Sequence, residues 1–149
     1  MIIRKANKFD LPYFVQIAKT VQEMNFVHDD AVLIDKHFNV LFNTIINGGG
    51  IALIAESEQP VGMVVGVIGE NVWMPQLFQL SQILFYVDEE WRNTRVGHKL
   101  LTEYNVQSQI LLDADRVNMC VIHASEPLHD INFDKFGYKM VEKIWQLEN

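Results

Sequence analysis

The stretch that decides the fold runs from Val87 to Leu101 and reads VDEEWRNTRVGHKLL. The apolar run that leads into it, Ile83 to Val87, predicts a buried strand. Beyond the polar residues, apolar side chains recur at helical spacing, at Val96, Leu100, Leu101 and Tyr104. The pattern therefore predicts a strand, a short polar loop and the start of a helix in direct succession.

The polar loop has the properties of an anion site. Backbone N–H groups at the start of a helix have no partner within the helix and lie at the positive end of its dipole. Gly97 would leave room for a phosphate to approach, and Arg92 and Arg95 would add positive charge. We therefore expect a phosphate or pyrophosphate held mainly by backbone groups. The alternative is an ordinary connection with a solvated basic loop.

Composition places the chain among globular proteins and limits its partners. Its 149 residues are 49% hydrophobic and 21% charged, with no repeats or linkers, so we expect one domain over residues 1–149. The longest apolar run, Val61 to Ile68, is too short to span a bilayer, and no secretory start is present. The net charge of −7 argues against nonspecific nucleic-acid binding. The single cysteine, Cys120, excludes an internal disulfide and fits the cytoplasm.

Hydrophobic periodicity predicts the remaining elements. We expect strands over Met1 to Ala6, Ile51 to Glu56, Val61 to Ile68, Gln79 to Val87, Val117 to Ala124 and, as one bent strand or two short ones, Tyr138 to Leu147. We expect helices over Leu11 to Met24, Ile34 to Ile46, Val96 to about Ser108 and His129 to Phe136. The order is βααβββαβαβ(β). Because it contains both a hairpin and helical crossovers, it predicts an α/β fold with a mixed sheet and helices on its faces.

This arrangement resembles the GNAT superfamily of N-acetyltransferases over essentially the whole chain. The family signature, Gln/Arg-x-x-Gly-x-Gly/Ala, is met by Arg92 and Gly97, while Arg95 stands in place of the middle glycine. A second match is the segment from Asn132 to Tyr138, NFDKFGY, which is similar to the family's late Phe-Tyr-Glu-Lys-x-Gly-Phe. The strand start that follows, from Tyr138 to Val141, is a third.

The resemblance implies that acetyl-CoA is the acyl donor. In the family the strand before the loop splays from the next strand, and the pantetheine lies between them as a pseudo-strand. Carried over to this sequence, the cofactor-binding residues are Phe85, Tyr86, Val87, Arg92, Asn93, Thr94, Arg95, Val96, Gly97, His98, Asn132 and Lys135. By the same resemblance, the backbone at the end of the first strand, Phe85 to Val87, would polarise the thioester carbonyl.

The catalytic groups are harder to assign. Many family members carry a late tyrosine that reprotonates the thiolate, and Phe133 stands at that position, where we expect it to pack. Tyr86 or Tyr138 could take its place. His123, at the end of its strand, is the preferred base because histidine titrates near neutral pH, with Glu126 and His129 as further candidates. A histidine hydrogen-bonded in the wall of the site fits its position equally well.

Other groups of polar side chains in the sequence give weaker indications of a functional site. His28, Asp29, Asp30, Asp35 and His37 include metal-ligand types but follow no recognised spacing, so we expect no metal site. By resemblance, that segment could instead receive a cationic amine. The acids from Asp88 to Glu90 are interpreted as a solvated cluster.

The resemblance therefore predicts an N-acetyltransferase. It would pass an acetyl group from acetyl-CoA to a primary amine, on a small molecule or peptide, by direct attack in a ternary complex. We expect neither nucleic acid nor a membrane as a partner. One alternative is a non-catalytic acyl-CoA-binding or protein-interaction domain, which Arg95 and Phe133 would favour. Another is a homodimer formed through the splayed sheet edge, with the cofactor site vestigial.

Overall fold

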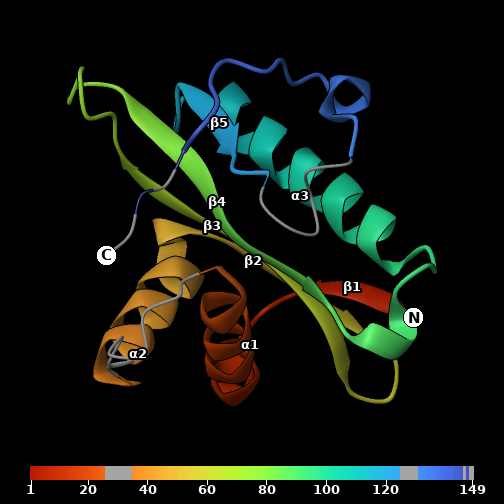
Figure 1. Cartoon of the computed structure of the whole chain (residues 1–149). Coiled ribbons are helices and arrows are strands. Elements are labelled where there is room, and N and C mark those ends of the chain that lie inside the picture. Colours follow the sequence, from red (N-terminus) through yellow and green to blue (C-terminus); the bar gives the residue numbers. More distant parts are fainter. Residues whose placement is uncertain (26–34, 125–130, 146, 148–149) are drawn as a thin grey trace.

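The computed structural model describes residues 1–25, 35–124, 131–145 and 147 (Figure 1). Its strands are β1 (Ile2–Lys5), β2 (Gly50–Glu56), β3 (Pro60–Glu70), β4 (Phe78–Val87) and β5 (Met119–Ile122). Its helices are α1 (Leu11–Asn25), α2 (Asp35–Thr44) and α3 (Val96–Asp113). Short helical turns are η1 (Lys8–Asp10), η2 (Ile45–Gly49), η3 (Glu89–Trp91) and η5 (Phe133–Phe136). The expected elements from Met1 to Ile122 are confirmed in kind and order.

The strands form one mixed sheet in the order β1-β2-β3-β4-β5. The first four pair antiparallel, whereas β5 runs parallel to β4. A parallel neighbour requires a crossover, and α3 supplies it. The predicted α/β fold with a mixed sheet is therefore confirmed.

Helices cover both faces of this sheet, as Figure 1 shows. On one face α1 and α2 pack over a cluster that includes Phe14, Phe42, Ile54 and Met63. On the other face α3 packs through Val96, Leu100, Leu101 and Tyr104 on strand residues such as Val64, Leu80 and Phe85. Alternate residues of β3 and β4 thus face opposite cores, which explains why these strands are nearly continuously apolar.

The start of the first helix is fixed by a polar network. Asn7 and Asp10 form a capping box at η1, in which the Asn7 N–H donates to Asp10 Oδ2 over 2.8 Å. Asp10 also accepts two hydrogen bonds from the Arg4 guanidinium, at 2.8 and 2.9 Å. The remaining Arg4 Nε–H donates to Glu56 on β2. The network therefore ties β1 and β2 to the entry of α1.

Two predictions at the C-terminal end are corrected. The described residues from Tyr138 onward form no strand. Their apolar residues come as the adjacent pairs Met140-Val141 and Ile144-Trp145, so they do not alternate and cannot turn one face to the core. The predicted helix from His129 is a shorter turn, η5, and residues 129 and 130 lie outside the described ranges. No helix in the described ranges has the length and apolar character needed to cross a membrane.

Candidate functional site

The central feature of the site is a fork between β4 and β5. The two strands pair only from Gln79 to Gln82 of β4, opposite Met119 to Ile122. Beyond Gln82, β4 continues to Val87 without a partner on this side among the described residues. One edge of its second half is therefore open to another extended group, as the family resemblance predicted.

A bulge in β4 marks the closed end of the fork. Val65 pairs with Leu84 and Gly66 with Gln82, so Ile83 is an extra residue in its strand, and its side chain is 41% exposed. A bulge bends its strand and increases the local twist. Because the bulge comes directly after the last pair with β5, it accounts for the divergence of the two strands. It also explains why β5 ends at Ile122, before the predicted Ala124.

The loop after β4 presents unpaired backbone donors. Asn93 has a positive φ of 62°, and the Val96 N–H is bonded to Thr94 Oγ1 over 3.3 Å. Within the described ranges no acceptor is found for the backbone N–H groups of Asn93, Thr94, Arg95, Gly97 and His98. Arg95 is the N-cap of α3, and its side chain makes no capping bond. The loop and helix start therefore offer the donors that an anion would need.

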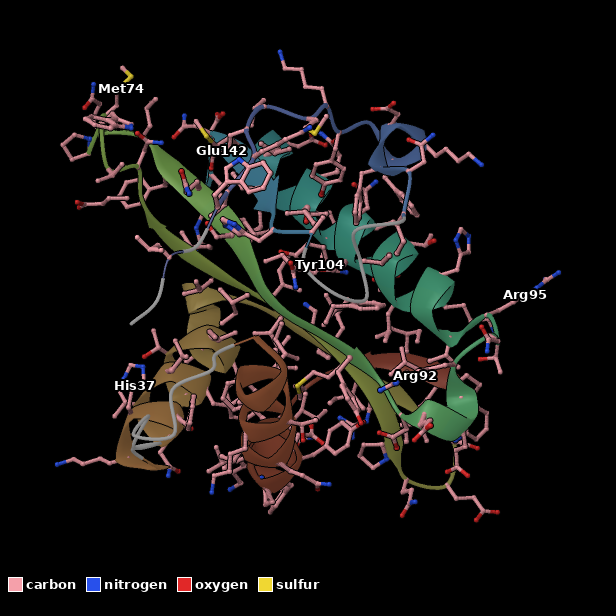
Figure 2. The ribbon with its side chains drawn as sticks, in the orientation of Figure 1. His37, Met74, Arg92, Arg95, Tyr104 and Glu142 are labelled. Carbon is pink, nitrogen blue, oxygen red and sulfur yellow. The ribbon has the colours of Figure 1, made fainter. Side chains whose placement is uncertain are left out.

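The two arginines differ in their freedom (Figure 2). Arg92 donates from Nε to the Val87 carbonyl over 2.9 Å, and its guanidinium lies 5.5 Å from the centroid of the Tyr86 ring. Arg95 is exposed and extends away from the ribbon. Of the two, Arg95 is therefore the one whose whole guanidinium is available to a ligand. Arg92 contributes its remaining N–H groups and fixes the turn out of β4.

Gly97 lies at the contact between α3 and β4. A Cβ at this position would lie 3.3 Å from Phe85 Cζ and 3.8 Å from Val87 Cγ2. The missing side chain therefore faces β4 and lets the first turn of α3 approach the sheet closely. The role of Gly97 in leaving room for a phosphate stays a prediction.

Two of the predicted catalytic residues, His123 and Tyr86, come from different strands of the fork. His123 follows β5 directly and is exposed, on the arm of the fork opposite β4. Tyr86 lies on β4 and packs with the α1–α2 core while its ring contacts Arg92. Glu126 lies outside the described residues. No hydrogen bond joins His123 to Tyr86, so the pairing of a base with an acid stays a prediction.

The late motif folds back on the start of α3. Asn132 caps η5 by accepting from the Asp134 N–H over 3.0 Å, and Gly137 ends the turn with φ 88°. Phe136 lies 5.9 Å from the His98 ring, measured between centroids. Asn132 and Lys135 are exposed on this turn. Phe133 packs on the α3 core, as expected of a residue without a hydroxyl.

A pair that the sequence did not reveal joins α1 to the end of β4. Tyr13 Oη donates to Asp88 Oδ1 over 3.1 Å. Burial raises the pKa of the Asp88 carboxyl, and the nearby Glu90 raises it further. Burial and the Asp88 charge likewise raise the pKa of Tyr13. Asp88 therefore has a partner in the fold, while Glu89 and Glu90 beside it are exposed, as expected. Its partner is 75 positions away in the sequence, so no local pattern could have indicated it.

Two buried polar atoms near the closed end of the fork were also missed. Gln82 Oε1 and Tyr104 Oη have no hydrogen-bond partner in the described part of the chain, although the side chains are 4% and 1% exposed. Gln82 is the last residue of β4 that pairs with β5, and Tyr104 Oη lies over its β3 partner Gly66. Periodicity assigned Tyr104 to the core without indicating an unpaired hydroxyl. Within the described ranges no group of side chains could hold a metal ion.

No protein-family model matches the sequence, and no curated protein matches it. Solved structures do match. One is a predicted acetyltransferase with acetyl-CoA from Clostridium acetobutylicum, 17% identical, with a TM-score of 0.73 over 99% of this chain and 95% of that one. Another is an aminoglycoside acetyltransferase from an uncultured soil metagenomic sample, 17% identical, with a TM-score of 0.66 over 99% and 96%.

The chain has the GNAT fold. A further match, at 12% identity, a TM-score of 0.66 and 99% coverage of both chains, is a transcriptional regulator from Bacillus halodurans C-125. At such identities the likeness establishes the GNAT architecture, and proteins of different description share it. Activity therefore has to be argued from the fork and the loop.

Proposed function

We propose that this GNAT-fold protein is an N-acetyltransferase that moves an acetyl group from acetyl-CoA to a primary amine. The observation that carries the proposal is the fork together with the open donors of the loop after β4. A pyrophosphate at the loop and an extended arm along the open edge of β4 would use groups that otherwise have no partner. The solved acetyltransferases of the same fold support this choice of chemistry.

The fork sets the direction in which the donor would bind. The pyrophosphate end of the donor would bind at Asn93 to His98, at the open end of the fork, with Arg95 as its charged partner. From Val87 back to Gln82, β4 rises about 17 Å, which suits an arm of extended amide units. The thioester would then lie near the bulge at Ile83, where backbone groups on the open edge can polarise its carbonyl.

The reaction we assign to this site is direct attack. The amine nitrogen attacks the thioester carbon and forms the amide bond, the carbon–sulfur bond breaks, and the thiolate takes up a proton while the nitrogen loses one. We assign the base to His123, which is exposed directly after the end of β5, with Glu126 as the further candidate. Tyr86, named from the sequence for returning the proton to sulfur, lies three residues along β4 from the bulge, so this role requires the thioester to lie nearer Val87 than Ile83. Asn132 and Lys135 would complete the cofactor site.

The acceptor is proposed only as a class. The net charge of −7 favours a cationic amine over a neutral or acidic one. The match to an aminoglycoside acetyltransferase makes small polyamine-like molecules reasonable first substrates. A peptide terminus or lysine is the second class to test. We expect the reaction to take place in the cytoplasm, which the single free cysteine fits.

A binding module without turnover is the second candidate. It is favoured by Phe133, which packs on the core and has no hydroxyl to donate, and by Arg92, whose guanidinium is engaged with Val87 and Tyr86. Both candidates bind the acyl donor, so binding tests the site and only turnover separates the two.

The binding test is a thermal-shift titration with acetyl-CoA and with free CoA. A ligand present at about a hundred times its dissociation constant stabilises a fold by about 2.7 kcal/mol, which gives a clear shift. Arg95→Glu should abolish most of it, because the substitution places a negative charge at the open donors. Lys36→Glu, an exposed charge reversal on α2, is the matched control and should leave the shift unchanged. A full shift in Arg95→Glu would contradict the loop assignment.

The turnover test follows thiol release from acetyl-CoA in the presence of an aminoglycoside, a polyamine or a lysine peptide. His123→Ala should reduce kcat about a hundredfold or more if the imidazole removes the proton. Thiol release that requires an amine, with the acetylated amine found by mass, would establish the enzyme. Binding without release for any amine class would favour the binding module.

A further inference from the structure

The bond between Tyr13 and Asp88 joins the first helix to the loop that we assign to the pyrophosphate. Tyr13 lies in the first turn of α1 and packs against the α1–α2 core, while Asp88 directly follows β4. The Tyr13 hydroxyl donates to Asp88 Oδ1 over 3.1 Å. Because α1 and α3 cover opposite faces of the sheet (Figure 1), the bond holds the Asp88 side chain toward the face that α3 does not cover.

The backbone of Asp88 is held as well. Its N–H donates to the Val61 carbonyl on β3 over 2.9 Å. Its carbonyl accepts from the Trp91 N–H over 2.8 Å, and this bond closes the turn η3. Asp88 is therefore the residue at which α1, the sheet and the loop after β4 are joined.

The connection continues from η3 to the first turn of α3. The Trp91 carbonyl accepts from the Thr94 hydroxyl, and Thr94 Oγ1 accepts from the Val96 N–H over 3.3 Å. Val96 is the first residue of α3 and is buried against the sheet. The series of bonds that begins on α1 thus ends within the segment that carries the open backbone donors. Those donors must be aligned if one anion is to use several of them.

The Tyr13 bond also fixes the place of a negative charge. A carboxylate close to a bound pyrophosphate opposes binding, and Asp88 precedes the first open donor, Asn93, by only a few residues. The charge of Arg92 already lowers the pKa of the Asp88 carboxyl. A carboxylate released from Tyr13 could therefore pair with Arg92 and compete with an anionic ligand for it.

We propose that Tyr13 is a positioning residue for the acyl donor. Through Asp88 it aligns the loop before α3 and holds a carboxylate on the α1 side of the sheet. The inference rests on the proposed function, because that proposal assigns the loop to CoA. It makes a residue of α1, on the face of the sheet opposite α3, a determinant of donor affinity.

The first test is a calorimetric titration of the full chain with CoA and with acetyl-CoA. Tyr13→Phe keeps the ring and removes the hydroxyl, and it should raise both dissociation constants about tenfold, because the two ligands share the pyrophosphate. Asp88→Asn should bind both ligands at least as tightly as the native chain, since its amide oxygen can accept the same bond without the charge. Thr20→Val is the control. It removes another hydroxyl of α1, whose bond to the Gln16 carbonyl stays within the helix, and should leave both constants unchanged.

The outcomes distinguish this inference from the proposed function. If the native chain binds neither ligand, both are overturned. If the native chain binds and Tyr13→Phe binds equally well, only the positioning role is overturned. A loss of affinity in Asp88→Asn as large as in Tyr13→Phe would overturn it too, because the charge and not the bond would then be responsible. An equal loss in Thr20→Val would show a general effect on α1, with the same consequence.

Hydrogen exchange tests the alignment without any ligand. The amides of Trp91 and Val96, which are the donors along the connection, should exchange about threefold faster or more in Tyr13→Phe than in the native chain. Amides of β2, from Gly50 to Glu56, are the internal reference and should exchange equally in the two proteins. Equal exchange at Trp91 and Val96 as well would show that the hydroxyl does not hold the loop, and would overturn the inference.

Discussion

The two faces of the sheet are constructed differently. On the α1–α2 face, Phe14 stacks on Phe42 with ring centroids 5.0 Å apart, and the surrounding buried side chains are aliphatic or Met63. On the α3 face the core also contains Ser108 and Tyr104. Gln82 points to that same face, since it lies two residues from Leu80 in a regular part of β4.

The difference suggests that the α1–α2 face mainly stabilises the fold, whereas the α3 face also serves the site. Apolar contacts on the α1–α2 face need no directional partners, so they stabilise the fold wherever they pack densely. On the α3 face two buried polar atoms have no partner among the described residues, and each such atom costs about 1–3 kcal/mol. Unfavourable groups of this kind are found where a fold serves a site, and these two lie at the closed end of the fork.

The largest expected effect concerns the apolar face. Phe14→Ala would remove a fully buried ring between α1 and α2 and leave a cavity. We expect a loss of about 3–5 kcal/mol in the free energy of unfolding, measured by urea denaturation. Val106→Ala, on the exposed side of α3, is the control and should change little. A loss below about 1 kcal/mol for Phe14→Ala would show that this face is not the main source of stability.

The next effect concerns the polar network that leads into the apolar face. Burial opposes the charge of Asp10, but hydrogen bonds from Arg4 and from the Asn7 N–H outweigh it and hold the pKa of the carboxyl below its ordinary 3.8. A carboxyl with a lowered folded pKa stabilises above the unfolded pKa, and that contribution is lost as pH falls through the folded value. Asp10 should therefore stabilise fully at neutral pH and lose its effect only in strong acid.

Asp10→Asn tests this directly. The variant keeps the shape but loses the charge that two Arg4 bonds require, so we expect a loss of about 1.5–3 kcal/mol at neutral pH. Urea denaturation at neutral pH and near pH 3 should show the difference between native and variant shrinking in acid. A difference that stays constant down to the acid limit would mean that the Asp10 charge does not contribute.

How much of this could be predicted from the sequence depends on the range of the interaction. The strands and helices up to Ile122 follow from local periodicity, and the loop before α3 from a compact motif. The fork itself was expected only through the family resemblance, because the bulge at Ile83 is a matter of register between β3 and β4. The Tyr13–Asp88 bond and the unpaired Tyr104 hydroxyl join residues that are distant in sequence.

Two glycines, Gly97 and Gly66, show the same limit of prediction from a single sequence. Gly97 lies in a motif that suggests a phosphate, but the motif does not indicate that the space of its missing side chain adjoins Phe85 and Val87. Gly66 lies in no motif, yet it pairs with Gln82 under the Tyr104 hydroxyl. A single sequence indicates that a glycine interrupts a pattern, but what occupies the space of its missing side chain is decided by another element.

The smallest expected effect concerns the packing of Gly66 against Tyr104 on the α3 face. A Cβ at Gly66 would fall 2.2 Å from Tyr104 Oη, on a ring that is 1% exposed and has no room to move. Gly66→Ala should therefore cost about 1–3 kcal/mol by overpacking. Gly69→Ala, on the same strand with nothing within 4 Å of its Cβ, should be nearly neutral.

Tyr104→Phe separates this contact from general strain. Alone, it removes a hydroxyl without a partner, so the variant should be no less stable than the native protein. Combined with Gly66→Ala it should recover most of the loss, since the nearest atoms to the new Cβ are then Leu80 Cδ1 at 3.0 Å and the ring Cζ at 3.1 Å. A double-mutant cycle by urea denaturation measures the coupling. Additive effects would mean that the Tyr104 hydroxyl is not what opposes a Cβ at position 66, and a clear loss for Tyr104→Phe alone would mean that the hydroxyl has a partner.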